Sequence, residues 1–141
     1  MTMTIHVDVV SAEAEIFSGL AEMVVIPARM GDVGIMPRHA PLLSPMKPGE
    51  VRVMKENGEE EAFYVSGGML EVQPHTVTVL ADTAIRAHDL DEAAALEAKQ
   101  RAEKMLTDKQ TDVDYAKAQA ELAEAMAQLQ ALERLRKMAH H

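Results

Sequence analysis

The distribution of glycine and proline divides this chain in two. All seven glycines lie between Gly19 and Gly68 and all six prolines lie between Pro27 and Pro74, so neither residue occurs after position 87. From position 88 onward the sequence has 13 alanines in 54 residues together with charges of both signs, a composition that favours helices. We therefore expect a β domain at residues 1–87 and an α-helical domain at residues 88–141.

The size and charge of the chain exclude several classes of protein. With 141 residues it has room for one or two small units but not for a large multidomain enzyme. Its 14 basic and 23 acidic residues give a net charge of −9, the wrong sign for a protein that binds nucleic acid through the phosphates. The absence of cysteine excludes a disulfide, a thiol nucleophile and a thiolate metal site. No apolar run approaches the roughly 18 residues of a spanning helix, and the first residues lack the pattern of a signal peptide, so we expect a soluble cytoplasmic chain.

Residues 1–87 have the patterns of an all-β domain. Ile5, Val7 and Val9 alternate with polar residues, which is the period of a strand with one buried face. The further runs predicted as strands are Glu22–Ile26, Val51–Lys55, Ala62–Ser66, Met69–Gln73 and Thr76–Ala81. Asn57–Gly58 lies between two of these runs and predicts a hairpin with a two-residue type I′ turn. Many short strands joined by close turns indicate a sandwich or a flattened barrel.

Residues 88–141 predict an antiparallel pair of helices. Asp89 and Glu92 have the spacing of a capping box, so the first helix is expected to begin there and to end near Leu106. Asp112 can cap the second helix after the polar stretch 107–111. The apolar stripes expected on the two helices are Leu90, Ala94, Ala98, Ala102 and Met105, and then Tyr115, Ala118, Leu122, Ala125, Leu129 and Leu132, the latter with coiled-coil spacing. Because alanines bury little apolar surface, we expect this hairpin to open readily.

The segment Gly31–Leu43, with the sequence GDVGIMPRHAPLL, is the most distinctive part of the chain. Its glycines and prolines predict a rigid loop rather than regular structure. A phosphate-binding nest is disfavoured, because the segment lacks the G-x-G-x-x-G and G-K-[S/T] patterns and a following helix. The loop is then either a structural turn or an exposed interaction loop. For His39 a partner contact, a structural hydrogen bond, and a metal or acid–base role all stay open.

Together with later segments, this loop resembles the epsilon subunit of bacterial F-type ATP synthase. The other segments that carry the resemblance, in the family's order and spacing, are Val9–Glu13, Phe17–Leu20, Ser66–Pro74, Ala81–Ala84, Asp89–Ala93 and Asp112–Ala116. The resemblance covers essentially the whole chain. It implies a fold of the β plus α class, in which a β-sandwich of about ten strands precedes a C-terminal antiparallel two-helix hairpin.

The same resemblance implies a non-catalytic subunit in the central stalk of a rotary, proton-translocating ATP synthase. Its implied partners are the gamma subunit, the c-subunit ring and the beta/alpha catalytic head, at the cytoplasmic face of the bacterial inner membrane. The residues implied at the c-ring interface are Gly31, Asp32, Arg38 and His39. The methionines that we expect on a sandwich face toward the gamma subunit are Met46, Met54 and Met69.

The helical domain is expected to act as a brake that opens and inhibits ATP hydrolysis. A helix over about Asp112–Met138 spans on the order of 40 Å at about 1.5 Å per residue, long enough to lie beside a central shaft. The resemblance implies an acidic segment of the beta subunit as the partner, and the cationic residues expected to contact it are Lys109, Arg134, Arg136 and Lys137. These charges equally fit a solvated helix end that complements the helix dipole.

A nucleotide site, which some members of the family have, is not expected here. The family pattern I/L-D-x-x-R-A begins well with Leu90 and Asp91, but Ala94, Glu124 and Gln128 stand where arginines belong. Without guanidinium groups to hold a triphosphate, we expect no cofactor and doubt any ATP binding. No paired carboxylates, nucleophile–base pair or metal cluster stands out, so neither a catalytic nor a metal site is expected.

Two other classes of protein stay open as alternatives. The chain could be a free-standing coiled-coil adaptor that oligomerises through the seam of its second helix. It could also be an ATP-sensing nucleotide-binding module. The loop Gly31–Leu43 argues against the adaptor, which does not require it, and the missing arginines argue against the sensor.

Overall fold

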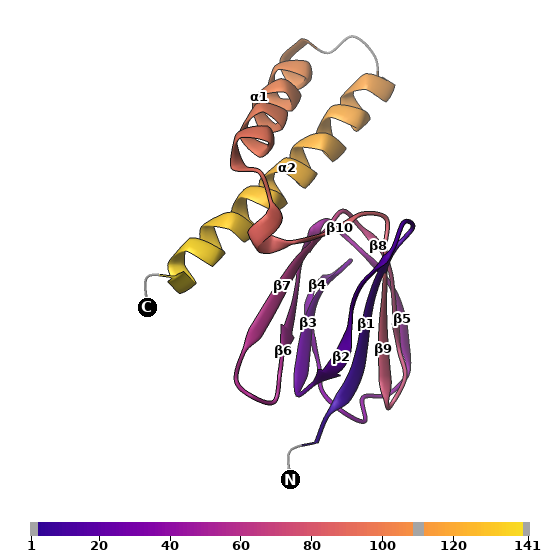
Figure 1. Cartoon of the computed structure of the whole chain (residues 1–141). Coiled ribbons are helices and arrows are strands. Elements are labelled where there is room, and N and C mark those ends of the chain that lie inside the picture. The colour runs from indigo at the N-terminus through magenta and orange to yellow at the C-terminus, as the bar shows by residue number, and fades with distance from the viewer. Residues whose placement is uncertain (1–2, 109–111, 140–141) are drawn as a thin grey trace. The chain divides into compact units, whose positions relative to one another are not determined.

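The computed structural model describes residues 3–108 and 112–139, which divide into two units between Arg86 and Ala87. The first unit is a β-sandwich of ten strands, and the second contains two α-helices (Figure 1). The predicted fold class is therefore confirmed. Each unit is described by itself below.

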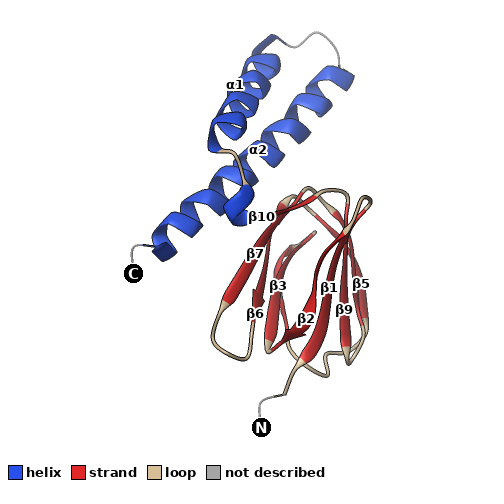
Figure 2. Cartoon of the chain, viewed as in Figure 1, coloured by secondary structure: helices blue, strands red, loops and turns tan. Residues whose placement is uncertain are grey.

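One sheet of ten strands folds over to form the sandwich (Figure 2). The strands are β1 (Ile5–Ser11), β2 (Glu15–Ala21), β3 (Met23–Ala28), β4 (Gly31–Ile35), β5 (Leu42–Met46), β6 (Gly49–Met54), β7 (Glu60–Val65), β8 (Gly68–Val72), β9 (Thr76–Ala81) and β10 (Ala84–Arg86). Their order is β10-β7-β6-β3-β5-β8-β9-β1-β2, and β4 pairs with β3 outside this path. Strands β1 and β9 are parallel, and the other recorded pairs are antiparallel.

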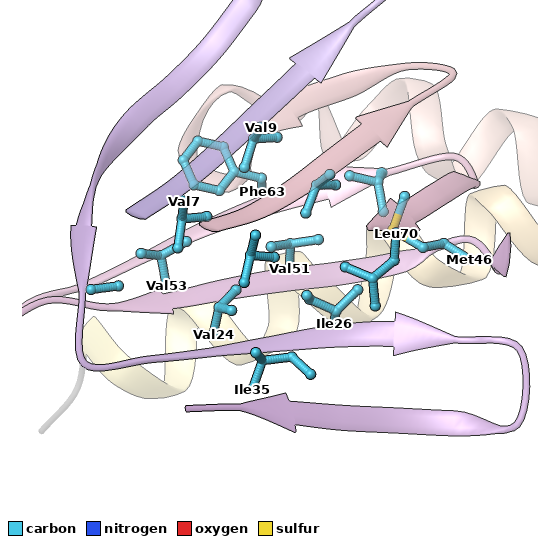
Figure 3. Close-up of a cluster of buried hydrophobic side chains, with 14 of the residues drawn as sticks. Val7, Val9, Val24, Ile26, Ile35, Met46, Val51, Val53, Phe63 and Leu70 are labelled. Carbon is cyan, nitrogen blue, oxygen red and sulfur yellow. The ribbon is translucent and has the colours of Figure 1, made fainter. Parts of the chain in front are cut away.

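Alternate residues of the strands build the core, as the period of two predicted. Ile5, Val7 and Val9 on β1 are fully buried. Figure 3 shows how aliphatic side chains from several strands gather around Phe63 and Leu70. Each such side chain contributes about 1.5–3 kcal/mol when it is removed from water. An aliphatic core can therefore hold this sandwich together although aromatic residues are only 3% of the sequence.

The hairpin between β6 and β7 is confirmed, but the predicted turn type is wrong. A type I′ turn needs a positive φ at both central residues. Gly58 has a φ of +85°, whereas Asn57 is not among the residues with positive φ. The Gly58 amide donates to the Lys55 carbonyl at 3.1 Å, and the Glu59 amide donates to the Asn57 side chain at 3.0 Å. The side-chain bond favours a longer loop in which glycine alone takes the left-handed conformation.

The prediction that Gly31–Leu43 lacks regular structure is also wrong. Its first five residues form β4 and its last two begin β5, so only residues 36–41 are a loop. Glycine weakens a strand because it has no side chain to pack. That cost is small in β4, which pairs with β3 alone at the margin of the sheet.

The helical unit begins with a 3-10 helix (Ala87–Asp89) and continues with α1 (Glu92–Asp108) and α2 (Asp112–Ala139). The predicted pair of helices is confirmed, but the cap of α1 is Asp91 rather than Asp89. The Ala94 amide donates to Asp91 Oδ1 at 3.2 Å. Asp89 cannot take this role because it ends the 3-10 turn, which a bond from the Leu90 amide to the Ala87 carbonyl closes at 3.2 Å.

Small side chains form the contact between α1 and α2. Among the helix residues whose burial is described, the buried ones are Ala95, Ala102, Ala118, Ala125, Ala127 and Ala131. The predicted stripes are thus correct at Ala102, Ala118 and Ala125. They are wrong at Ala94 and Tyr115, which are exposed. The fully buried positions therefore carry single methyl groups, while Leu122, Leu129 and Leu132 of the predicted stripe are half-buried.

Candidate functional site

An apolar row crosses the outer face of four strands of the sandwich. The apolar row consists of Pro45 on β5, Met69 on β8, Leu80 on β9 and Val10 on β1, each the registered neighbour of the next. Met69 is 37% exposed and Leu80 is 45% exposed. Their neighbours along the strands, Leu70 and Val79, are fully buried. Because side chains alternate along a strand, the row faces away from the core.

Further features extend the surface around the apolar row. Leu43, two residues before Pro45 on the same strand, is 68% exposed. Two hollows of about 350 and 410 Å³ flank the row. The first is lined by Val10, Ser11, Ala12, Leu80, Ala81 and Asp82, and the second by Pro41, Leu42, Leu43, Glu71, Val72 and Gln73. Isolated exposed apolar residues are common, but a contiguous apolar surface with hollows is typical of a protein-binding site.

The sequence contains a signal for this surface that the strand predictions did not use. In β9 the core positions are Val77, Val79 and Ala81, which are all buried. Leu80 is an apolar residue in the opposite phase, where an alternating strand normally has a polar one. Met69 lies in the same position relative to Leu70. Each of β8 and β9 therefore has one apolar residue on the face that is normally polar. Only the pairing of the two strands shows that these residues, Met69 and Leu80, are neighbours.

The residues expected at the c-ring interface come from two separate elements. Gly31 and Asp32 lie on β4, where Asp32 is exposed and registers with Pro27 of β3. Arg38 and His39 lie in the loop that follows. In the described part of the chain, no hydrogen bond or ion pair joins Asp32 to His39. The structure thus gives two polar positions rather than one assembled pair.

Backbone hydrogen bonds fix the conformation of the loop that carries Arg38 and His39. The Arg38 amide donates to the Pro74 carbonyl at 2.9 Å, and Arg38 has a φ of +65°. The ring of His39 donates from Nδ1 to the Ala40 carbonyl oxygen at 2.7 Å. A structural hydrogen bond and a partner contact are therefore compatible for His39, because Nδ1 alone makes the former. Among the described residues, no three His, Cys, Asp or Glu side chains converge on a point that could hold a metal ion.

The three methionines expected toward the gamma subunit do not form one surface. Met46 is only 7% exposed and belongs to the core, as Figure 3 shows, so its place on the predicted surface must be corrected. Met46 is the last residue of β5, and its side chain lies on the core face of the strand, whereas the preceding residue, Pro45, is exposed. Met54 is half-buried on β6 and registers with Met23. Met69 lies in the apolar row.

Two of the cations expected to contact the catalytic head make ion pairs within the helical unit. Arg136 pairs with Glu92 at the start of α1, and Lys137 Nζ lies 3.6 Å from Glu133 Oε1. Arg134 is half-buried. Lys109 lies outside the described residues. The pair of Lys137 lies within α2, and the exposed pair of Arg136 with Glu92 contributes about 0–1 kcal/mol, so these pairs do not hold the two helices together strongly.

A shallow hollow of about 300 Å³ lies along the two helices. Its lining residues are Ala98, Arg101, Glu121, Glu124, Ala125 and Gln128. Glu124 and Gln128, which are expected to stand at positions of the family's arginines, thus belong to one concave surface, whereas Ala94 is not part of its lining. Arg101, for which the sequence pattern predicted no role, is the one cationic residue of this lining, which also contains the carboxylates of Glu121 and Glu124.

Comparisons with known proteins assign the chain to a family. The family model described as the beta-sandwich domain of the ATP synthase Delta/Epsilon chain matches residues 4–87, and the model of its long alpha-helix domain matches residues 88–133. The chain belongs to the ATP synthase delta/epsilon family. The predicted resemblance to the bacterial epsilon subunit is thereby confirmed, and the proteins of this name are regulatory or structural subunits rather than catalytic ones.

Bacterial members of the ATP synthase delta/epsilon family are closely similar to this chain. It is 67% identical to the ATP synthase epsilon chain of Nitrosococcus oceani over 137 residues, and this matched region covers 97% of this chain and 98% of the relative. It is 69% identical over 136 residues to that of Alkalilimnicola ehrlichii, with 96% and 97% covered. In both comparisons the similarity extends over nearly the full length of the two proteins.

Solved structures of ATP synthases share the fold of this epsilon-family chain. A chain of the Euglena gracilis mitochondrial enzyme, solved as an OSCP/F1/c-ring assembly, gives a TM-score of 0.83 at 18% identity over 92% of this chain and 81% of that one. A chain of the Tetrahymena thermophila central stalk/c-ring gives 0.62 at 12% identity, with 93% and 98% covered. Among the described residues, no helix is both long and apolar enough to cross a membrane.

Proposed function

We propose that this subunit couples the catalytic head of a proton-translocating ATP synthase to its membrane c ring and inhibits ATP hydrolysis through its helices. The observation that carries the coupling role is the apolar row, a contiguous apolar surface on a unit that has its own complete core. The row would bind the gamma subunit, while Asp32 and His39 would meet polar groups of the c ring. The subunit would then be peripheral to the membrane, at the cytoplasmic face of the bacterial inner membrane.

Replacement of Met69 and Leu80 together by glutamate is expected to weaken binding to the gamma subunit about tenfold or more. Full burial of one such side chain contributes about 1.5–3 kcal/mol, and because less than half of each remains exposed, the two together contribute about 1–2.5 kcal/mol on binding. About 1.4 kcal/mol corresponds to a tenfold change in Kd. The matched control is the double replacement of Leu20 and Met30 by glutamate, since these residues are 55% and 97% exposed but lie outside the row. Titration calorimetry with purified gamma subunit measures both variants.

The c-ring contact is measured separately by Asp32→Ala with His39→Ala. Exposed polar pairs contribute only about 0.2–1 kcal/mol each, so attachment of the head to the ring is expected to weaken a few-fold. Binding to the gamma subunit should stay unchanged in this variant.

The apolar-row variant, with Met69 and Leu80 replaced, must lose more affinity for the gamma subunit than its control, with Leu20 and Met30 replaced. An equal loss in the two variants would refute the proposed surface.

The subunit is expected not to bind ATP appreciably. In the hollow of the helical unit, Glu121 and Glu124 oppose the triphosphate, and Arg101 alone cannot replace several bidentate guanidinium contacts. Calorimetry of the full chain in millimolar Mg-ATP should give no binding heat. Restoring arginine at positions 94, 124 and 128 provides the matched gain-of-binding variant. A micromolar Kd for the unmodified chain would show that this interpretation of the replacements is wrong.

A further inference from the structure

Arg86 forms a side-chain bridge between the two ends of the folded sheet. Strands β2 and β10 are the terminal strands of the sheet order, and Arg86 is the last residue of β10. Its guanidinium donates to Glu61 Oε2 on β7 at 3.1 Å and to the Ile16 carbonyl oxygen on β2 at 2.9 Å. One side chain therefore links the two ends of the sheet, which do not pair with each other through their backbones.

The surroundings of Arg86 fix the direction of its guanidinium. The group lies over the ring of Phe63, 5.2 Å from its centroid, in a cation–π contact. Phe63 in turn packs against Phe17 of β2 at a centroid distance of 5.5 Å. The planar guanidinium can then donate to Glu61 and to the Ile16 carbonyl oxygen at the same time, a geometry that a lysine ammonium cannot reproduce.

The acceptor Glu61 is held in its charged form. Lys55 Nζ also donates to Glu61, at 3.0 Å. Partial burial raises the pKa of Glu61, but the hydrogen bonds and charges of Lys55 and Arg86 outweigh it, so the pKa lies below its ordinary value. Both Arg86 and Glu61 remain about one-third exposed, so salt and solvent screen part of this attraction.

The position of the bridge in the chain gives it a consequence for the helical unit. Arg86 is the last residue of the sandwich unit, and the 3-10 helix begins at the next residue. Strand β10 has only three residues and registers with β7 alone. Any displacement of the helical unit therefore acts on a strand that few backbone bonds hold.

We propose that Arg86 is a positioning residue that sets the pivot of the helical unit. Its bridge to Glu61 and Ile16 keeps β10 on the sandwich, so the helices move about the segment after Ala87 and do not peel β10 away. The regulatory part of this proposal rests on the inhibitory role proposed above, whereas the bridge itself does not. A fixed pivot also keeps the helices close to one region of the assembled enzyme and so raises their effective concentration there.

Hydrogen exchange of the full chain tests the bridge. In Arg86→Ala, the amides of residues 84–86 are expected to exchange at least tenfold faster, while those of β1 keep their protection. In Arg86→Lys the exchange rate of these amides should be intermediate, because an ammonium group can donate to one of the two acceptors but cannot reproduce the geometry of a guanidinium that donates to both. The matched control is Arg52→Ala on β6, a half-buried arginine of the same sheet. Unchanged exchange of β10 in Arg86→Ala overturns the bridge.

ATP hydrolysis by the assembled enzyme tests the pivot. Arg86→Ala is expected to raise hydrolysis at least twofold without weakening attachment to the gamma subunit, and Arg86→Lys should restore part of the inhibition. Faster exchange of β10 with unchanged hydrolysis overturns the pivot and leaves a purely structural bridge. If removal of the whole helical unit also leaves hydrolysis unchanged, then the inhibitory role is wrong as well, and the exchange experiment still decides the bridge.

Discussion

Removal of residues 88–141 is expected to leave a folded sandwich that still couples, while ATP hydrolysis by the assembled enzyme rises at least about fivefold, the lower end of a typical regulatory coupling. The sandwich should fold alone because its core cluster lies wholly within strands β1–β9. The apolar row and Asp32 also lie in that unit. Hydrolysis is measured in membranes with the variant subunit, beside a gamma-binding measurement that checks assembly.

The contact between the helices is weak enough to allow the change of conformation that the proposed inhibition requires. Its buried residues are alanines, and each buried methyl group contributes only about 0.8 kcal/mol before the entropy cost of ordering is subtracted. The described ion pairs of Arg136 and Lys137 are exposed and add little. The closed and open forms can then be near in free energy, so that contacts with the catalytic head select between them.

Two double point variants separate the proposed inhibition by the helices from any other effect of deleting residues 88–141. Arg136→Ala with Lys137→Ala is expected to relieve part of the inhibition, because both side chains are exposed cations near the end of α2. Lys99→Ala with Lys117→Ala removes the same charge elsewhere in the helical unit and should have a smaller effect. Hydrolysis that stays unchanged after the full deletion, with assembly intact, would show that the helices do not inhibit this enzyme.

Local patterns were enough to predict six of the ten strands and both helices. Each of the six predicted runs overlaps a strand, with bounds that differ by no more than two residues at each end. Alternation over a buried face determines such runs. Strands β2, β4, β5 and β10 were not predicted from these patterns. β2, β4 and β10 lie at the margins of the sheet, where a strand needs little side-chain packing, so glycine or a short length does not prevent pairing. β5 contains Pro45, and a proline in a run argues against a strand. The cap of α1 was misplaced because Asp89 and Asp91 both have suitable side chains, and the 3-10 turn selects between them.

The candidate site was less predictable because it depends on distance between strands. Met69 was identified from its residue type, and Leu80 was not, although the two are cross-strand neighbours. Met46 has the same residue type as Met69, but the phase of its strand turns it into the core. The bridge from Arg86 to Glu61 and Ile16 joins positions 25 and 70 residues apart, and a spacing pattern in the sequence does not reveal such contacts.

Replacement of Gly68 by alanine is expected to lower the free energy of unfolding by about 2–6 kcal/mol. Gly68 has a φ of +134°, which strains any residue with a Cβ atom. A Cβ atom there would also lie 2.1 Å from the Leu80 carbonyl oxygen and 3.0 Å from Ala81 Cα. Both obstacles are backbone atoms of β9, so no change of rotamer relieves the overlap. Strands β8 and β9 would have to separate.

Two other glycines resolve this effect into its two causes. Gly58→Ala retains the strain of a positive φ, +85°, but its Cβ atom would meet nothing within 4 Å, so about 1–3 kcal/mol is expected. Gly34→Ala has neither problem, since its nearest contact is Met23 Sδ at 3.8 Å, and should change stability by less than about 1 kcal/mol. Urea unfolding of the three full-length variants, followed by circular dichroism, gives these values. The close approach of β8 and β9 also places Met69 beside Leu80, so Gly68→Ala should reduce the affinity for the gamma subunit as well. If Gly68→Ala is as stable as Gly34→Ala, then the close approach of these two strands is wrong.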